Sequence, residues 1–170
     1  MNPNTRALGA TILFSVAALW ALLFHAVPFE FVWPHALFYA TLTINTYFSV
    51  RFYSAFTPET TFQYLIDGAL TLAYIALALS IGLPVPFALC ALLVFAIAPA
   101  KYAQMLGATA YDKTLRKKIL IDLLGTSMCV AVLGITLLGY ESQGAWLLAG
   151  LFAAANVYLL LIKPMYRHVL

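Results

Sequence analysis

The chain has 170 residues, of which 64% are hydrophobic and only 9% are charged. Soluble domains carry charge on roughly a quarter of their residues, so this composition excludes an ordinary soluble domain and predicts a surface that faces lipid. The formal net charge of +3 does not indicate nucleic-acid binding, because basic residues beside apolar segments set membrane topology and contact anionic lipid headgroups.

Six apolar segments follow one another along the chain. A membrane-spanning helix needs about 20 residues to cross a hydrocarbon layer about 30 Å thick, so six of them occupy nearly the whole chain and leave short turns. We therefore expect an all-α, polytopic integral membrane protein that forms a single transmembrane domain over residues 1–170. The expected spans are residues 7–27, 31–51, 58–82, 86–105, 117–139 and 144–162.

Turn and capping residues mark the ends of several spans. The first segment resembles a secretory signal peptide, but it has full span length and lacks a small-residue cleavage site. Thr57, Pro58 and Glu59 match an N-cap, a proline in the first helical position and an acid in the first turn, so they predict the start of the third span. Lys163 and Pro164 close the sixth span.

Lys and Arg residues occur only at the termini and in or beside alternate loops. The other loops contain neither, and positive charge near the ends of spans marks the cytoplasmic side. We therefore predict three hairpins with both termini in the cytoplasm, in a plasma (inner) membrane. The basic residues are Arg6, Arg51, Lys101, Lys113, Arg116, Lys117, Lys118, Lys163 and Arg167.

Five polar residues lie inside the spans, one to two turns from the predicted cytoplasmic ends. At about 1.5 Å per residue this places them roughly 6–12 Å within the membrane, where ionisable groups are rare and mark functional sites. Asp67 and Asp122 share the context Leu-Ile-Asp at a spacing of 55 residues (67 to 122), which indicates either a hairpin repeat or a chance match. We name this set the inner polar belt: Asn45, Asp67, Lys101, Asp122 and Asn156.

Two interpretations of the inner polar belt remain open. In the first, the belt lines an ion or solute pathway, with Asp67 and Asp122 as acceptors for a cation or a proton. In the second, the belt is a structural network in which Lys101 and Arg51 neutralise the two carboxylates across helices.

A proline interrupts the fourth predicted span. Pro99 removes the backbone hydrogen bond to the carbonyl of Phe95 and bends the helix there. Membrane helices tolerate proline, so a static kink and a moving hinge both remain open. If the protein has a gate, Pro99 beside Lys101 is its predicted place.

No metal site and no cofactor are expected. His25, Glu30 and His35 flank the first predicted turn, and imidazole and carboxylate suit zinc or copper, but no fourth ligand accompanies them. A haem would need axial histidines that face the bundle interior, whereas His25 and His35 both lie near one outer end. Cys90 and Cys129 lie inside spans without metal-type spacing, so we expect them to be buried small hydrophobic residues.

Two features indicate partners besides the lipid bilayer. Gly150 and Ala154, at spacing four in the sixth span, permit close helix packing. We therefore expect this span to contribute an interface in a homo-oligomer or with partner membrane subunits. The basic cluster of Arg116, Lys117 and Lys118 beside the 106–117 loop either anchors the chain at the lipid surface or docks an acidic partner.

The sequence contains no nucleophile elbow, no HExxH motif and no glycine-rich phosphate loop, so we expect no enzymatic activity and no catalytic residues. In size and number of spans the chain is similar to substrate-binding subunits of modular vitamin importers and to a small cell-shape membrane protein, although no residue motif carries this similarity. The inner polar belt favours an oligomeric transport protein, a channel or carrier for an ion or small solute. The alternative is a non-catalytic anchor or assembly subunit of a larger membrane complex.

The predicted orientation is testable with single cysteine probes in a variant that lacks Cys90 and Cys129. Probes in the 51–61 and 106–117 loops should react with an impermeant reagent only from the cytoplasmic side, and probes near Glu30 and Glu141 only from outside. Labelling of the 106–117 loop from outside would overturn the orientation.

Overall fold

A computed structural model of the chain describes residues 2–24, 29–107 and 111–166. These residues form six α-helices and a short π-helix that continues the last of them, so the expected all-helical class is confirmed for this part of the chain. The elements are α1 (Pro3–Phe24), α2 (Phe29–Tyr53), α3 (Thr61–Leu79), α4 (Pro84–Ala103), α5 (Asp112–Leu137), α6 (Glu141–Val157) and the π-helix η1 (Tyr158–Ile162).

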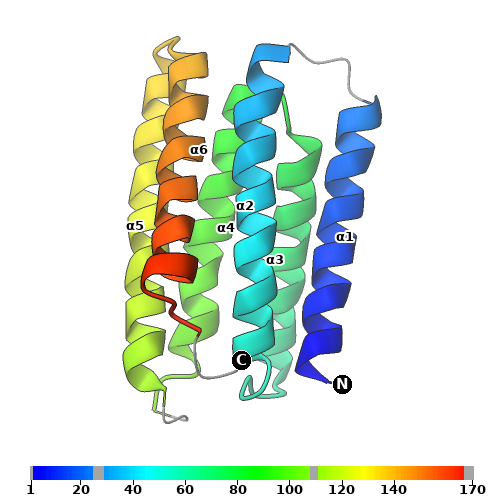
Figure 1. Cartoon of the computed structure of the whole chain (residues 1–170), viewed down its shortest axis with the longest axis vertical. Coiled ribbons are helices and arrows are strands. Elements are labelled where there is room, and N and C mark those ends of the chain that lie inside the picture. The colour runs from blue at the N-terminus through cyan, green and yellow to red at the C-terminus, as the bar shows by residue number, and fades with distance from the viewer. Residues whose placement is uncertain (1, 25–28, 108–110, 167–170) are drawn as a thin grey trace.

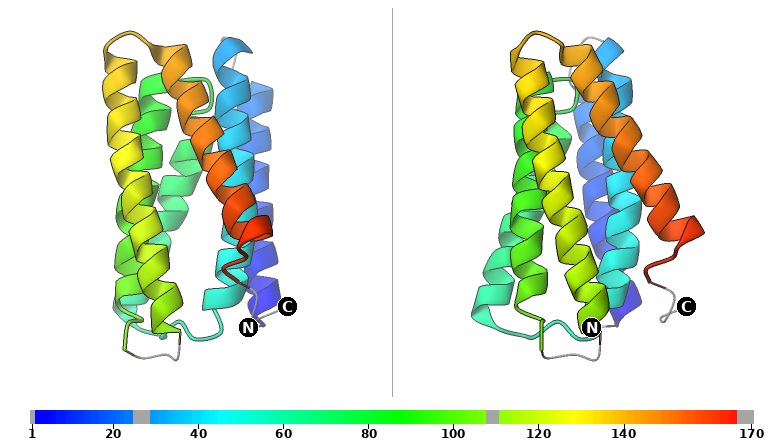
Figure 2. Two further views of the ribbon diagram at one scale, coloured as in Figure 1. Left: turned by 60° about the vertical axis from the view of Figure 1, so that its left-hand side comes forward. Right: turned by 90° about the vertical axis from the view of Figure 1, so that its left-hand side faces the viewer.

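The helices stand side by side and form a ring (Figures 1 and 2). Consecutive helices pack as three pairs, α1 with α2, α3 with α4 and α5 with α6, and further contacts join α1 to α3, α4 to α5 and α2 to α6. The order around the ring is therefore α1, α2, α6, α5, α4, α3. Helix α1 begins at the lower end of the bundle in Figure 1, and η1 ends in the lower half, above that end.

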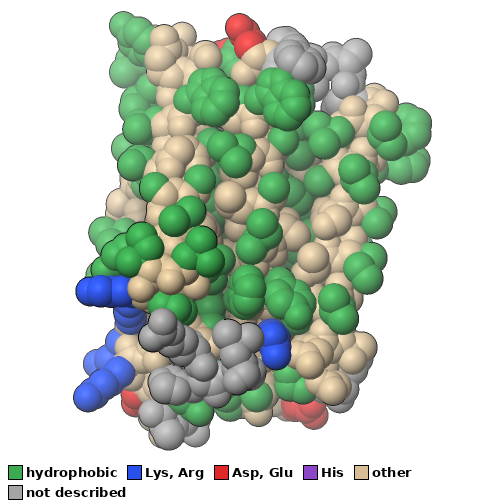
Figure 3. Space-filling model, in the orientation of Figure 1, with side chains coloured by type: hydrophobic (Ala, Val, Ile, Leu, Met, Phe, Trp, Pro, Cys, Tyr) green, Lys and Arg blue, Asp and Glu red, His purple; other side chains and the backbone are tan. Residues whose placement is uncertain are grey.

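The Lys and Arg side chains that are visible in Figure 3 lie in the lower half of the bundle, and we name this end the basic end. The Lys and Arg residues that the structure describes lie near the start of α1 or α5, near the end of α2 or α4, or directly after η1, which are the parts of the chain that reach this end. They are Arg6, Arg51, Lys101, Lys113, Arg116, Lys117, Lys118 and Lys163.

Apolar side chains cover the sides of the bundle (Figure 3). Leu23, Leu138 and Leu161 are 76%, 77% and 73% exposed, and a continuous surface of this kind is unfavourable in water and suits lipid. Within the described residues, α1, α3, α4, α5 and α6 together with η1 are long and apolar enough to cross a membrane, whereas α2 is not among them. These helices indicate a membrane protein.

Helix α2 falls short of this criterion, and several of its polar side chains are buried in the bundle. The side chain of Thr43 is buried and donates to the carbonyl oxygen of Tyr39 at 2.9 Å. The hydroxyl of Tyr39 in turn lies 3.2 Å from the carbonyl oxygen of Phe14 in α1 and 3.3 Å from that of Tyr74 in α3. A helix that binds its neighbours through such groups needs less apolar surface than one that faces lipid on most sides.

The main apolar core fills the half of the bundle away from the basic end. The ring of Phe38 is fully buried, with centroid distances of 5.5 Å to Phe87 and 4.7 Å to Phe152. Cys129 is buried in this core and Cys90 packs against it, as expected for small hydrophobic residues. A second cluster lies at the basic end and consists of Phe52, Tyr53, Tyr102, Met105, Leu115 and Tyr166.

The expected start of the third span was wrong. Helix α3 begins at Thr61, and its N-cap is Thr60, whose side chain accepts a hydrogen bond from the backbone N–H of Gln63 at 3.2 Å. The hydroxyl of Thr57 instead donates to the carbonyl of Tyr53 at 2.8 Å. Thr57 therefore satisfies a carbonyl at the end of α2, a role that its sequence context does not separate from N-capping.

His35 joins α2 to the turn between α3 and α4. Its Nδ1 accepts the backbone N–H of Gly82 at 3.0 Å, and its ring stacks on Phe87 with centroids 3.9 Å apart. Gly82 has a φ of 88°, a left-handed conformation that glycine adopts without strain. His35 is therefore a structural residue in this fold, and its expected neighbour His25 lies outside the described residues.

Helices α5 and α6 approach each other closely at Gly144. A Cβ atom at this position would lie 2.8 Å from the side-chain oxygen of Thr136, whereas one at Gly134 would meet no atom within 4 Å. We expect Gly144→Ala to lower the free energy of unfolding by about 1–3 kcal/mol through overpacking. Gly134→Ala, the matched control, should change it by less than about 1 kcal/mol. Unfolding in mixed micelles followed by circular dichroism measures both, and equal stabilities would contradict the close packing.

Candidate functional site

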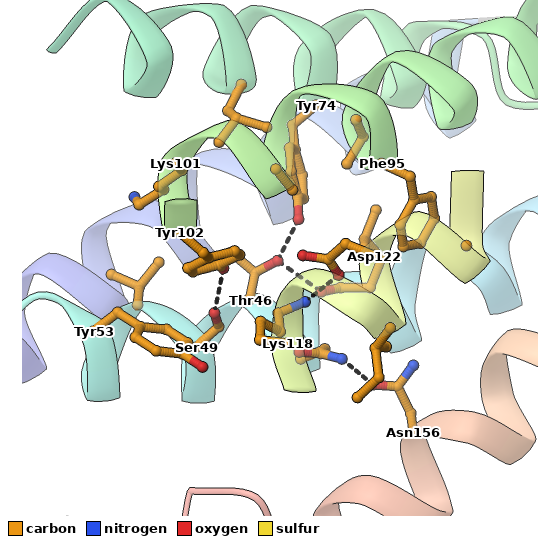
Figure 4. A pocket seen from close by; sticks show the side chains of 18 of the residues that line it. Thr46, Ser49, Tyr53, Tyr74, Phe95, Lys101, Tyr102, Lys118, Asp122 and Asn156 are labelled. Carbon is orange, nitrogen blue, oxygen red and sulfur yellow. Dashed lines mark hydrogen bonds and ion pairs between the residues drawn. The ribbon is translucent and has the colours of Figure 1, made fainter. Parts of the chain in front are cut away.

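A cavity of about 600 Å³ lies inside the ring of helices and receives side chains from all six of them and from η1. It reaches from the basic end, where Arg6, Thr57 and Lys117 line it, to the middle of the bundle, where aromatic residues of the main core line it. Figure 4 shows the polar part of its wall. A volume of this order suits a small organic ligand.

All five residues of the inner polar belt line this one cavity. The structure therefore brings together side chains from α2, α3, α4, α5 and α6 that are far apart in the sequence. Their common location on one wall is the geometric condition that a pathway through the cavity would require. They are Asn45, Asp67, Lys101, Asp122 and Asn156.

Lys101 neutralises Asp67 near the basic end. Its Nζ lies 2.6 Å from Oδ1 of Asp67, and the two side chains are 17% and 40% exposed. The same carboxylate oxygen accepts a hydrogen bond at 3.0 Å from the side-chain amide of Gln63, one turn earlier in α3. This contact is one of the two cross-helix pairings that the sequence left open for Lys101.

Asp122 has a different partner from the ones expected. Lys118, one turn earlier in α5, donates to its Oδ1, and the two side chains are only 10% and 1% exposed. The expectation that Lys118 belongs to a basic cluster at the lipid surface was therefore wrong. The reason is that α5 begins at Asp112 rather than at 117, so Lys118 lies on an established helix whose inner face points into the cavity.

Each of the two aspartates has a lysine of its own as its ion-pair partner. They also differ in depth, since Asp67 is half-exposed and Asp122 is buried.

Two amides join α2 to α6 across the cavity wall. The side-chain N–H of Asn45 donates to Oδ1 of Asn156 at 2.6 Å, and Asn156 donates to the carbonyl of Phe152 at 2.9 Å. The hydroxyl of Tyr166 donates to Oδ1 of Asn45 at 3.4 Å. This chain of hydrogen bonds attaches the segment after η1 to the wall of the cavity.

Tyrosine hydroxyls supply most of the remaining polar wall (Figure 4). The hydroxyl of Tyr74 in α3 lies 2.6 Å from that of Thr46 in α2, and the hydroxyl of Tyr102 in α4 lies 2.8 Å from that of Ser49 in α2. The ring of Tyr53 lies 4.7 Å from the ring of Tyr102, centroid to centroid. These contacts hold α2 against α3 and α4 beside the two ion pairs.

Three buried polar side-chain atoms on the cavity wall have no hydrogen-bond partner within the described residues: Oδ2 of Asp122, Oη of Tyr53 and Oγ of Ser54. Asp122 and Tyr53 are the most deeply buried of the three residues, at 1% exposure each. A buried polar group without a partner is unfavourable, so these three atoms are candidate contacts for a bound ligand.

Pro99 lies inside α4, and the helix continues through it to Ala103. The residue whose carbonyl loses its hydrogen bond, Phe95, lines the cavity with its ring. The described residues contain no group of three or more His, Cys, Asp or Glu side chains placed to hold a metal ion.

Sequence reasoning missed several residues of the cavity wall. Lys118 and Asp122 stand four residues apart, the spacing at which opposite charges pair on a helix, and this spacing was the available signal. Tyr53 and Tyr102 lie near the ends of spans, where tyrosines usually anchor a helix at the membrane interface. Nothing in the sequence distinguishes a tyrosine that points inward from one that points to lipid.

The described residues form an all-helical fold whose apolar helices indicate a membrane protein, and its internal chamber has charged and polar groups on a largely apolar wall. The chain matches no family model, and comparisons with curated proteins and with solved structures found no significant match.

We expect the buried pair of Lys118 and Asp122 to affect the free energy of unfolding. Removing one partner leaves an uncompensated charge, so Lys118→Met should lower the free energy of unfolding by about 3–5 kcal/mol. The double variant Lys118→Met/Asp122→Asn should lose less, because no isolated charge remains. The more exposed pair provides the control: Lys101→Met should cost about 1 kcal/mol or less.

Reversible unfolding in mixed micelles measures these variants and the single variant Asp122→Asn, which completes the cycle. A double variant whose loss equals the sum of the two single losses would show that Lys118 and Asp122 are not coupled.

Proposed function

We propose that this chain is a small membrane transport protein, a channel or carrier for an ion or small solute, with its basic end and both termini in the cytoplasm. The orientation is supported by the Lys and Arg residues of the basic end, since positive charge near span ends marks the cytoplasmic side. Helix α2 crosses the membrane with the others in this proposal. Its 25 residues are long enough, and its polar groups point inward.

The observation that carries the proposal is the cavity. A pure anchor has no use for an internal chamber of about 600 Å³ whose wall carries two ion pairs, two amides and several hydroxyls. Side chains of this kind are costly within a membrane and lie where ions or solutes pass. The cavity begins at the basic end and stops at mid-bundle, which is the form expected of a carrier open to one side.

Aromatic rings lie at the inner end of the cavity, and we name Phe14, Phe38, Phe95 and Phe152 the aromatic layer. Phe14, Phe95 and Phe152 line the cavity, and Phe38 packs against Phe95 and Phe152, with centroid distances of 6.3 Å and 4.7 Å. In this proposal the layer separates the solute from the other side of the membrane. Pro99 leaves the carbonyl of Phe95 without its helical partner, so α4 is able to bend at the layer itself. This relation makes Pro99 the hinge of the proposed transport cycle.

Flux measurements in proteoliposomes test the proposal. Vesicles with the purified protein should show a flux of at least one species from a panel of protons, Na⁺, K⁺, chloride, phosphate, and labelled amino acids and sugars. Ala98→Leu adds bulk to the cavity wall and should reduce that flux at least about tenfold. Ala76→Leu, on the exposed side of α3, is the matched control and should retain it. Absence of flux for the whole panel, with the protein folded and inserted, would overturn the transport role.

A second function has one specific observation in its favour. Gly150 and Ala154 are both exposed, and a Cβ atom at Gly150 would meet nothing within 4 Å. This outward small-residue face of α6 suits close packing of a second helix, as in a homo-oligomer or an assembly subunit of a larger complex. Intact-complex mass measurement in mild detergent tests it: Gly150→Leu should reduce the assembly to the single chain, while Gly134→Leu should not. A single chain in the unmodified protein would contradict it.

A further inference from the structure

The deepest polar group of the cavity is an ion pair that is only half satisfied. Asp122 uses Oδ1 for Lys118, and its Oδ2 has no hydrogen-bond partner within the described residues although the side chain is 1% exposed. Lys118 has three N–H donors, of which one goes to Asp122. The pair therefore presents an anionic acceptor and a cationic donor next to each other inside the cavity (Figure 4).

Aromatic groups surround this pair. The Nζ of Lys118 lies 5.4 Å from the centroid of the Tyr102 ring, and Tyr102 packs against Tyr53. The hydroxyl of Tyr53 is another buried polar atom without a hydrogen-bond partner in the described part of the chain. Farther from the basic end, the wall is formed by Phe14, Phe95 and other apolar residues. The cavity thus has a polar site for a head group and an apolar chamber for a body.

The charge balance of the wall limits the charge of the ligand. Two ion pairs lie on the wall itself, Lys101 with Asp67 and Lys118 with Asp122. Arg6 also lines the cavity, near the basic end, and it pairs with Glu59, an exposed residue outside the lining. Lys117 also lines the cavity, but its side chain is exposed at the rim, where water screens it. A ligand with a net charge would remain uncompensated at the buried pair, and such burial is strongly unfavourable.

An inorganic ion fits this arrangement poorly. Each carboxylate on the wall already has a lysine as its counter-ion, and the chamber is far larger than an ion needs and is mainly apolar at its inner end. A ligand that carries both charges satisfies the pair directly, because its ammonium group donates to Oδ2 of Asp122 while its carboxylate accepts from Lys118. Hydrogen bonds between charged groups are stronger than those of an uncharged head group.

We propose that the cavity binds a small zwitterion, with an ammonium group beside a carboxylate, whose apolar or aromatic body occupies the chamber between Phe14 and Phe95. The proposal rests on the proposed transport function, since it names the class of solute that is carried. Asp122 and Lys118 hold the two charges, and Tyr53 supplies a further hydrogen bond.

Calorimetric titration of the detergent-purified protein tests the head group with four probes that share one phenyl-containing body. L-Phenylalanine is the zwitterion, phenethylamine the cation, 3-phenylpropanoate the anion and 3-phenylpropanamide the uncharged amide. We expect L-phenylalanine to bind at least about tenfold more tightly than each of the others, and at least about tenfold more tightly than glycine, which lacks the body. Equal or tighter binding of any other probe, or no binding of L-phenylalanine, would overturn the proposal.

Removing one charge of the pair at a time predicts a gain of binding, which a damaged fold would not produce. In Asp122→Asn the charge of Lys118 has no counter-ion. The affinity for 3-phenylpropanoate should therefore rise at least about tenfold, while the affinity for L-phenylalanine falls. In Lys118→Met the affinity for phenethylamine should rise in the same way. Lys113→Met, an exposed lysine outside the cavity, should leave the order of all four probes unchanged. The proposal fails if neither charge variant gains its opposite probe.

Binding and flux separate the two proposals. If L-phenylalanine binds in the predicted order but no species crosses the proteoliposome membrane, the ligand class stands and the transport role is wrong. If another species is carried and L-phenylalanine does not bind, the transport role stands and the ligand class is wrong.

Discussion

Charged and amide side chains within apolar helices need partners inside the bundle, because hydrocarbon offers neither hydrogen bonds nor counter-ions. This constraint explains why the ring of helices has a polar interior at the basic end. It also explains the composition of α2, which is less apolar than that of a lipid-facing span. Its side chains include Thr43 and Asn45, which form hydrogen bonds inside the bundle. The cavity is the space that these inward groups enclose.

The two ion pairs meet the constraint in different ways. Lys101 and Asp67 lie where water reaches them in part, and Gln63 adds a further hydrogen bond to the same carboxylate oxygen. Long side chains at this depth are also able to reach the interface, so this pair fits a structural role. Lys118 and Asp122 are buried and leave one carboxylate oxygen unbonded. A protein that needed only stability would place apolar residues there, which is the reason to connect the deeper pair with ligand binding.

Both devices that would let the bundle move lie beside this chamber. Pro99 weakens α4 at the carbonyl of Phe95, whose ring belongs to the aromatic layer. In α6, which is separated from α4 by α5 in the ring, the helix changes into the π-helix η1 at Tyr158, two residues after Asn156, and π-helical turns recur at functional sites. In the proposed carrier, movement at either place changes the cavity without breaking the apolar contacts between α4 and α5 farther from the basic end.

The sequence by itself determined the helical class, the number of long helices within the described residues and the five polar-belt residues that meet at one cavity, because apolar runs and misplaced polar residues are local signals. It placed helix ends less well: Thr57 has the composition of an N-cap, yet its hydroxyl bonds to Tyr53 across the end of α2. Only the tertiary structure decided the partners. Lys118 was equally compatible with the lipid surface and with the interior, and the choice depended on the rotation of α5 against α4 and α6. The tyrosines of the wall carry the same ambiguity, since the direction of a side chain around a helix follows from packing against neighbours that are remote in sequence.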